Sequence, residues 1–323
     1  MERRAFVIGS LAALTWPGVC LPRGKIARLG WLSAGRAELD VGLVDAFRRG
    51  MTELGYAEGR RFVLEQRYAA GNPKSLPAAA AELAHLRLDA IVASGDQAAL
   101  AAKAASASMP IVVHVADALG TGLVANLARP GGNITGITDL HADLVPKRLE
   151  MLKELVPNLS RAAFLSNPGN PTCVAQASEI RAAAPSFALG VIVAEAATAA
   201  DLDRIFSSMM RDNVQGLIVC GDRILATHGQ RIHELARKAR LPAMYANRRF
   251  VESGGLMSYG TNLADVYRRL AVYVDRILKG AKPGELPLEQ PTQFEVVISL
   301  KAAKAIGLAV PRALLARADH VFD

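Results

Sequence analysis

The chain alternates short β-branched runs with amphipathic segments, and it does so in the same order through two successive halves. In the first half, the apolar residues of 41–54 recur at helical spacing and stop at Gly55, which predicts a helix after a strand at 26–32. The strands expected in this half are 26–32, 62–68, 90–93 and 111–115, with helices at 41–54, 76–86 and 97–107. Alternation of this kind predicts a parallel sheet with helices on both faces.

The pattern restarts after a turn-forming stretch at 128–133, which reads Ala-Arg-Pro-Gly-Gly-Asn. The second half is expected to hold helices at 145–155, 175–184, 200–211 and 230–240, and strands at 162–165, 189–194, 216–220 and 242–245. A strand ending at 258–260, a long helix over 263–277 and a last strand at 294–298 follow. The predicted fold class is therefore α/β, with two doubly wound parallel-sheet domains and a ligand cleft between them.

The composition fits a water-soluble globular chain of two domains, since 51% of the 323 residues are hydrophobic and 21% are charged. The net charge is +8, but basic residues are scattered and aromatic residues make up 5%, so we predict no nucleic-acid partner. Cys20, Cys173 and Cys220 lack zinc-ligand spacing, and the common nucleophile and nucleotide-binding motifs are missing. We expect no metal, no cofactor and no catalysis. If the chain is exported, Cys173 and Cys220 can form a disulfide, and the sequence does not decide whether they do.

The first 24 residues have the layout of an export signal. Arg3 and Arg4 precede an apolar run over 5–16, and prolines and glycines break the segment after it. The arginine pair resembles a twin-arginine signal, with the Sec route as the alternative. Val19-Cys20 is a weak match to a lipidation motif, so lipid anchoring at Cys20 is a further alternative. The competing interpretation is a short buried helix at the start of a cytosolic domain. We expect export, and therefore a periplasmic protein.

Small and polar residues stand directly after the expected strands of both halves. Hydroxyl groups and glycines ahead of a helix suit a carboxylate, whereas aspartates suit an ammonium group, so the set predicts a site for a zwitterion. We expect Ser33 and Ser94 to hold the carboxylate. The amino group would go to Asp117 or Asp222. The candidate ligand-binding residues are Ser33, Ala34, Ser94, Gly95, Asp96, His114, Asp117, Asn167, Asn170, Asp222, Arg223, Tyr245 and Tyr259.

Each candidate also has a purely structural interpretation. Ser94, Asp96 and Asn170 stand where helix N-caps are common, and His114 follows an apolar run and fits a core histidine. Polar residues follow the strands in both halves, and this favours a binding role over a structural one. A cleft that closes on a ligand needs polar residues on each of its two sides. If the ligand is aromatic, Tyr245 and Tyr259 are available to stack on it.

The sequence resembles a known family from about residue 26 to the C-terminus. It is similar to the ABC transporter substrate-binding proteins of the group that includes the tryptophan-binding lipoproteins, which have a type I periplasmic binding fold. The stretches that carry the resemblance are 127–136, 147–157, the Asn-Pro-x-Asn-Pro turn at 167–171, 254–260, 277–283 and 314–319. These motifs are specific for the family and carry no information on the ligand.

The resemblance implies a protein that closes on one small molecule outside the cytoplasmic membrane and delivers it to a membrane permease. It also implies three crossovers between the domains, near 138, 262 and 286. The expected division is an export signal at 1–24, a first domain of 25–137 plus 262–285, and a second of 138–261 plus 286–323. By position, Ser33, Ser94, Asn167, Asp222 and Tyr259 fall where the family lines its cleft.

We predict a monomeric binding protein for an amino acid or an aromatic carboxylate. One alternative is a sensor, in which the same closure signals to a membrane receptor. The other is a two-domain enzyme of the racemase or hydrolase type, whose turnover would depend on Cys173 or Cys220.

Overall fold

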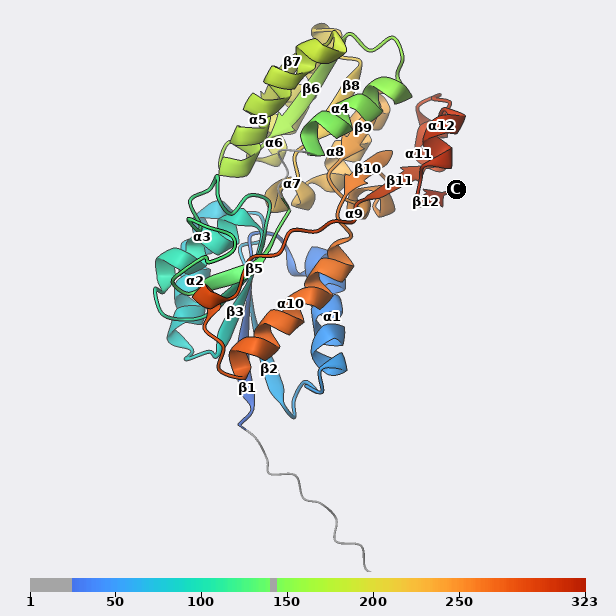
Figure 1. Ribbon diagram of the computed structural model, residues 1–323. Helices are drawn as coiled ribbons and strands as arrows, with labels where there is room; N and C mark the ends of the chain where they lie inside the picture. The colour runs from blue at the N-terminus through green and yellow to red at the C-terminus, as the bar shows by residue number, and fades with distance from the viewer. Residues whose placement is uncertain (1–24, 140–143) are drawn as a thin grey trace, which may run out of the picture.

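The structure is a computed structural model that describes residues 25–139 and 144–323, and it shows two lobes with one β-sheet each (Figure 1). The expected export signal at 1–24, including Cys20, lies outside the described residues. The N-terminal lobe has a five-stranded sheet in the order β2-β1-β3-β4-β5, with all neighbours parallel. Its strands are β1 (Ala27–Ser33), β2 (Phe62–Tyr68), β3 (Ala90–Ser94), β4 (Ile111–Val115) and β5 (Ile134–Thr138).

Two pairs of helices cover the faces of this sheet. On one face α1 (Ala37–Glu53) packs along α10 (Leu263–Leu278), and on the other α2 (Leu76–His85), which follows η1 (Pro73–Ser75), packs beside α3 (Asp96–Ala105). Side chains alternate along a strand, so Trp31 of β1 joins the core under α1 and α10 while Leu32 joins the core under α2 and α3. A strand buried on both faces needs apolar residues along its whole length, and the inner strands β3 and β4 accordingly read as nearly continuous apolar runs.

The C-terminal lobe has a seven-stranded sheet in the order β12-β11-β10-β9-β8-β6-β7. Its strands are β6 (Arg161–Ser166), β7 (Gly190–Glu195), β8 (Gly216–Val219), β9 (Ala243–Tyr245), β10 (Met257–Gly260), β11 (Glu295–Ser299) and β12 (His320–Phe322). Its helices are α4 (Leu144–Leu155), α5 (Pro171–Ala183), η3 (Ala184–Phe187), α6 (Ala199–Arg211), α7 (Arg223–Thr227), α8 (Gly229–Lys238), α9 (Arg248–Glu252), α11 (Leu300–Ala305) and α12 (Arg312–Ala316).

One strand pair of this sheet departs from the parallel arrangement that we predicted. β10 and β11 are antiparallel, whereas the pairs from β7 through β10 are parallel. The reason is the route of the chain. β10 runs toward the N-terminal lobe and leads into α10, and β11 starts where the chain returns from that lobe, so the two strands must run in opposite directions (Figure 1).

The third crossover follows Glu289, a few residues later than the position near 286 that we expected. The backbone N–H of Thr138 donates to the carbonyl oxygen of Glu289, and the N–H of Glu289 donates to that of Gly136, both over 2.9 Å. Residues 286–289, which follow η4 (Pro283–Glu285), therefore lie beside β5, where Glu289 forms an isolated bridge with Ile137. Figure 1 shows the segment after them rising alone to β11.

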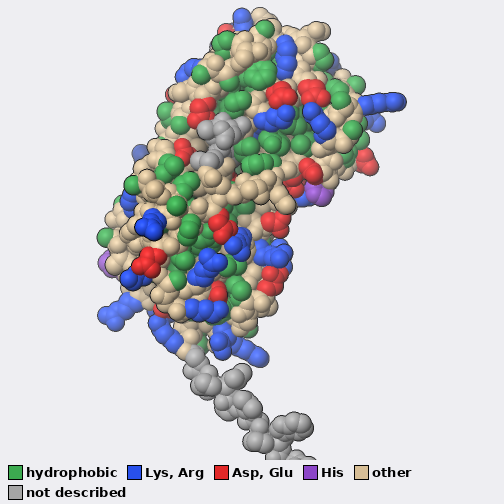
Figure 2. Space-filling model, viewed as in Figure 1, with side chains coloured by type: hydrophobic (Ala, Val, Ile, Leu, Met, Phe, Trp, Pro, Cys, Tyr) green, Lys and Arg blue, Asp and Glu red, His purple; other side chains and the backbone are tan. Residues whose placement is uncertain are grey.

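The predicted fold class and the order of the longer elements are confirmed. The sequence did not indicate the helices α7, α9, α11 and α12, because five or six residues are too few to show a helical period, and it did not indicate the three-residue strand β12. Figure 2 shows basic and acidic side chains interspersed over one face, in keeping with scattered basic residues. Over the described ranges, no helix combines the length and the apolar character that crossing a membrane would require.

Candidate functional site

A cavity of about 120 Å³ lies between the lobes, where loops from the carboxyl ends of strands in both sheets meet. Loops after β3, β4 and β5 form one side, and loops after β8, β9 and β10 form the other. The lining residues are Leu39, Gly95, Asp96, His114, Ala116, Asp139, Gly221, Asp222, Arg223, Ala226, Ala246, Asn247, Arg249, Phe250, Ser253, Thr261 and Leu263. Gln97 of α3 donates a hydrogen bond across the gap to the carbonyl oxygen of Gly169, over 3.2 Å. The structure is therefore a closed arrangement of the two lobes.

Five of the thirteen residues that we predicted from the sequence line this cavity, namely Gly95, Asp96, His114, Asp222 and Arg223. Strand register explains the positions in the N-terminal lobe, because Ser33 pairs with Ser94 and Ser94 pairs with His114. The ends of neighbouring parallel strands thus meet at one edge of the sheet.

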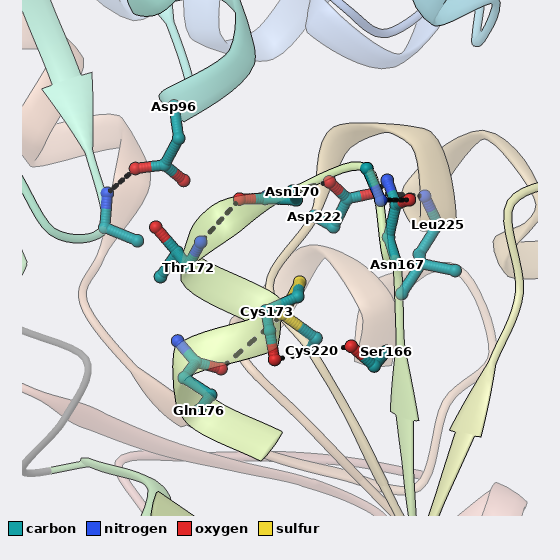
Figure 3. Close-up of a disulfide and its surroundings, with 12 residues drawn as sticks. Asp96, Ser166, Asn167, Asn170, Thr172, Cys173, Gln176, Cys220, Asp222 and Leu225 are labelled. Carbon is teal, nitrogen blue, oxygen red and sulfur yellow. Dashed lines mark hydrogen bonds between the residues drawn. A yellow bond between two sulfur atoms is a disulfide. The ribbon is translucent and has the colours of Figure 1, made fainter. Parts of the chain in front are cut away.

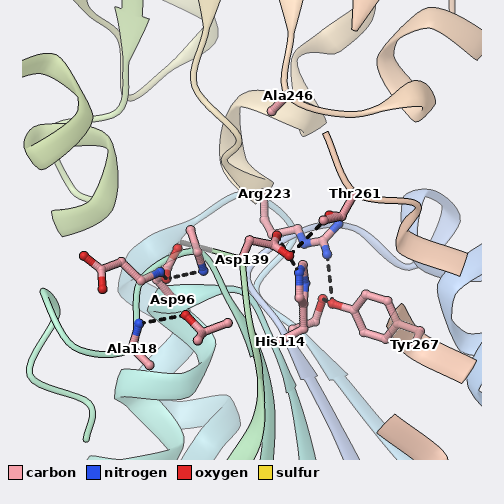
Figure 4. A network of polar contacts seen from close by, with 12 residues as sticks. Asp96, His114, Ala118, Asp139, Arg223, Ala246, Thr261 and Tyr267 are labelled. Atoms are coloured by element: carbon pink, nitrogen blue, oxygen red, sulfur yellow. Dashed lines mark hydrogen bonds and ion pairs between the residues drawn. The ribbon is translucent and has the colours of Figure 1, made fainter. Parts of the chain in front are cut away.

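Asp96 and Gly95 shape the loop after β3. Asp96 Oδ1 accepts hydrogen bonds from the backbone N–H groups of Ala116, over 2.9 Å, and Asp117, over 3.4 Å, and so fixes the loop after β4 (Figure 4). Gly95 has φ +93°, and a Cβ at this position would lie 3.2 Å from Cγ of Arg223. Glycine is therefore required here both for the backbone conformation and for the approach of the opposite lobe.

A polar group at the crossovers closes one side of the cavity. His114 Nε2 lies 2.8 Å from Asp139 Oδ2, and the Thr261 hydroxyl donates to Asp139 Oδ1 over 3.3 Å (Figure 4). Asp139 and Thr261 lie on the first and second crossovers, so this group links the N-terminal sheet to two of the connecting segments.

Asp222 is held by two asparagine side chains from the Asn-Pro-Gly-Asn-Pro turn. Asn167 Nδ2 donates to Asp222 Oδ1 over 3.1 Å, and Asn170 Nδ2 donates to Oδ2 over 2.9 Å (Figure 3). Asp222 is also the N-cap of α7, since its Oδ1 accepts from the backbone N–H of Leu225. These bonds orient a buried carboxylate that lines the cavity.

Arg223, the residue after Asp222, crosses from the C-terminal lobe into the N-terminal lobe. Its Nη2 donates to the hydroxyl of Tyr267 on α10 over 2.9 Å, and that hydroxyl lies 2.5 Å from Ser94 Oγ (Figure 4). Burial works against the charge of Arg223, but Tyr267 and Asp40 outweigh it and raise the pKa of the guanidinium group. Arg223 therefore stays cationic in a buried position.

A second arginine shares the same counterion. Asp40 Oδ1 lies 3.9 Å from Nη1 of Arg223 and 3.9 Å from Nη1 of Arg249, and Asp40 is 1% exposed. Burial, reinforced by the charge of Arg223, lowers the pKa of Arg249 to about 10, so this arginine is still charged at neutral pH. Two guanidinium groups thus face one carboxylate at long range, which leaves this end of the cavity positive.

The sequence did not indicate Asp40, Arg249, Tyr267 or Asp139. Asp40 and Tyr267 lie on helices, where no strand end marks them, and Arg249 belongs to a helix of five residues. Asp139 follows β5 directly, so a strand assigned to 134–138 would have made it a candidate ligand-binding residue at a strand end.

The other predicted residues lie outside the lining of this cavity. The Ser33 hydroxyl accepts from the N–H of Gly35, Ala34 is in the core, and the Asp117 carboxylate accepts from Leu119 and Gly120. Ser94 forms a hydrogen bond with Tyr267, and Asn167 and Asn170 donate hydrogen bonds to Asp222.

Neither tyrosine is placed to stack on a molecule in this cavity. Tyr245 is 1% exposed and its ring stacks on Phe250, with centroids 5.0 Å apart. Tyr259 packs near Phe294 in a separate groove beside the third crossover. Phe250 lines the cavity, and its ring stacks on that of Tyr245.

Cys173 and Cys220 form a disulfide, with their Cα atoms 5.9 Å apart (Figure 3). This settles the pairing that the sequence left open. Cys173 lies in the first turn of α5, just after Asn170, and Cys220 lies two residues before Asp222. The disulfide therefore joins the two loops that carry the Asp222 group.

The family model of ABC transporter substrate-binding proteins matches residues 39–322. The chain belongs to this family. A tyrosine-binding protein of Clostridioides difficile (strain R20291) is 22% identical over 263 residues, which cover 81% of this chain and 75% of that protein. Substrate-binding proteins of this family act outside the cytoplasm, where they bind small-molecule ligands and deliver them to ABC permeases.

Solved structures agree with the two-lobe fold of a type I periplasmic binding protein. A conserved domain protein of Vibrio cholerae is 26% identical, with a TM-score of 0.87 over 92% of this chain and 100% of that one. An ABC domain of Streptococcus pneumonia in complex with L-Trp is 23% identical, with a TM-score of 0.85 over 92% of this chain and 100% of that one. The substrate-binding protein described here is thus a solute-binding component of an ABC transporter.

Proposed function

We propose that the ligand is a small zwitterion, namely an amino acid, held between the positive and negative ends of the inter-lobe cavity. The observation that carries this proposal is the charge distribution in the lining. Arg223 and Arg249 share Asp40 as a distant counterion, and Asp222 and Asp96 line the same cavity. The arginines suit the ligand carboxylate, and the aspartates suit its ammonium group. An aromatic carboxylate would use the arginines and the ring of Phe250.

Binding by domain closure follows from the placement of these groups. Asp96 belongs to the N-terminal lobe, whereas Asp222, Arg223, Arg249 and Phe250 belong to the C-terminal lobe. A ligand that contacts both sets gains these contacts together in the closed form, and only such differential contact shifts the equilibrium toward closure. The relatives that bind tyrosine and L-Trp support an amino acid as the ligand class.

We also propose that the protein acts in the periplasm. Residues 1–24, with Arg3 and Arg4 ahead of an apolar run, direct the chain to the periplasm. There the protein acts as a monomer without catalytic activity and presents its loaded, closed form to the permease.

The test is a thermal-unfolding screen of the purified protein against amino acids, their des-amino carboxylates and aromatic acids. A ligand at a hundred times its dissociation constant adds about 2.7 kcal/mol of stability. We expect one amino acid or a small group of them to shift the midpoint. Shifts by sugars or nucleosides alone would overturn the proposed ligand class.

Two variants test the assignment of the charged groups. Arg249→Gln should weaken both the amino acid and its des-amino analogue, while the exposed Arg237→Gln changes neither. Asp222→Asn should weaken the amino acid by about 2–5 kcal/mol, as for a buried charge that loses its partner, and leave the analogue unchanged. An Asp222→Asn variant that still prefers the amino acid over its analogue would show that Asp222 does not bind the ammonium group.

A further inference from the structure

The helix α7 belongs to the C-terminal lobe, but it also packs into the N-terminal lobe (Figure 1). Two neighbouring apolar residues of this helix belong to different cores. Leu225 packs in the core of the C-terminal lobe, whereas Ile224 packs in the core of the N-terminal lobe under α2 and α3. Each of them is 1% exposed. The described lining of the inter-lobe cavity does not include Ile224, so its burial depends on the position of the lobes and not on contact with a ligand.

Glycines in the loops after β1, β2 and β3 leave room for α7 on the N-terminal lobe. A Cβ at Gly71 would lie 2.8 Å from Thr227 Oγ1. A Cβ at Gly95 would lie 3.2 Å from Arg223 Cγ, and one at Gly35 would lie 3.9 Å from Arg223 Cβ. The loops after β1 and β2 are also joined to each other by backbone hydrogen bonds. These three loops therefore form a fixed seat into which α7 fits closely.

α7 is held in its own lobe by contacts that do not involve this seat. Asp222 caps the helix and accepts hydrogen bonds from Asn167 and Asn170, and the disulfide of Cys220 lies two residues before Asp222. The helix is thus fixed to the C-terminal lobe. Opening of the lobes takes Ile224 out of the N-terminal core and exposes its side chain to water, which is unfavourable whatever fills the cavity.

We propose that α7 is a latch of the closed form and that Ile224 is the positioning residue of this latch. The proposal rests on the binding by domain closure that we proposed above. Seating of α7 stabilises the closed form by the same amount with every ligand, and the apparent affinity scales with the fraction of protein that can close. Ile224 therefore sets the overall affinity, whereas the residues that line the cavity decide which ligand is preferred.

The first experiment traps the seated helix in the purified, ligand-free protein. A Cβ at Gly71 would lie 3.5 Å from Thr227 Cβ, and a disulfide spans about 3.5–4.5 Å between Cβ atoms. The double variant Gly71→Cys, Thr227→Cys should therefore form a bond between the lobes when oxidised glutathione is added. If the lobes are mostly open, adding Ile224→Ala should slow this bond at least about tenfold, and Ile224→Val should slow it less.

The second experiment is sensitive when the lobes are mostly closed, and it leaves Gly71 in place in case the double variant folds poorly. The single variant Thr227→Cys is labelled with N-phenylmaleimide, which requires α7 to leave its seat. Adding Ile224→Ala should then speed the labelling at least about tenfold, with Ile224→Val in between.

The control is Ile205→Ala on α6, at an isoleucine that is 5% exposed in the core of the C-terminal lobe. It should lower the midpoint of thermal unfolding and leave both rates unchanged. If Ile224→Ala also left both rates unchanged, or if a folded double variant formed no bond between the lobes, the latch would be overturned. Neither experiment uses a ligand, so a failed ligand screen would contradict the proposed ligand class and leave the latch standing.

Discussion

Arg223 and Tyr267 join the two lobes, because the guanidinium group of Arg223 donates to the Tyr267 hydroxyl over 2.9 Å. The same hydroxyl lies 2.5 Å from Ser94 Oγ at the end of β3, so Arg223 reaches the N-terminal sheet through one intervening side chain. Arg223 also lines the inter-lobe cavity. We therefore expect Arg223 to couple occupancy of this cavity to closure of the lobes.

We predict that Arg223→Ala weakens closure and ligand binding together. Loss of a hydrogen bond that involves a charged group, here the one from Arg223 to the Tyr267 hydroxyl, costs about 1.5–3 kcal/mol. Small-angle scattering should show a more open average shape, and calorimetry should show weaker binding of the amino acid found in the screen. Tyr267→Phe removes only the hydroxyl and should have a smaller effect in the same direction.

The control for this prediction is Arg204→Ala, at a surface arginine of α6 whose side chain is 71% exposed. Surface ion pairs contribute about 0–1 kcal/mol, so neither closure nor binding should change. If Arg223→Ala behaved like this control, Arg223 would have no part in closure.

The packing of α1 against α10 gives a prediction with a matched control in one helix. A Cβ at Gly50 would overlap the carbonyl oxygen of Arg268 and lie 2.8 Å from Cβ of Ala271, whereas a Cβ at Gly42 would meet nothing within 4 Å. Gly50→Ala should therefore lower the free energy of unfolding by about 1–3 kcal/mol. Gly42→Ala should raise it by up to about 1 kcal/mol, because alanine favours the helix.

Denaturant unfolding of the two glycine variants measures this difference directly. Equal stabilities would mean that α10 can shift away from α1 at low cost.

Removal of the disulfide should lower stability and also weaken binding. The two cysteines are 47 residues apart, and in the chain-entropy model a loop of this length corresponds to about 4 kcal/mol. The double variant Cys173→Ser, Cys220→Ser should lose up to this amount in denaturant unfolding. It should also bind less tightly, because the loops of Asn170 and Asp222 are no longer linked. Reduced wild-type protein should match the variant, and a reducing agent should leave the variant itself unchanged.

His233 of α8 is only 8% exposed, and this burial predicts a pH dependence of stability. Burial lowers the folded-state pKa of His233 below its ordinary value of 6.5, so between these two values the unfolded chain binds more protons than the folded one. This contribution to stability is present above pH 6.5 and is lost as the pH falls through the folded pKa. Unfolding free energies of the wild type should fall more steeply below pH 6.5 than those of His233→Phe. Parallel curves for the two proteins would contradict the lowered pKa.

The sequence was sufficient to predict the longer helices and strands. The apolar period of 263–277 predicted α10 almost to the residue, and the apolar run at 111–115 predicted β4. Such signals are local, since burial of one helix face or of a strand leaves a period in the residues themselves. The antiparallel β11 could not be predicted in this way, because its direction depends on where the chain returns from the other lobe.

The sequence by itself determined the α/β class, the two lobes and the strand ends where polar residues gather, including Asp96, His114, Asp222 and Arg223. Only the tertiary structure decided which of these meet in one cavity, and which partners orient them. Asp40, Tyr267 and Arg249 come to the site through the packing of α1 and α10 and through the closed position of the lobes. Contacts of this kind join residues up to 209 positions apart, as Asp40 and Arg249 are, and no local period in the sequence records such a separation.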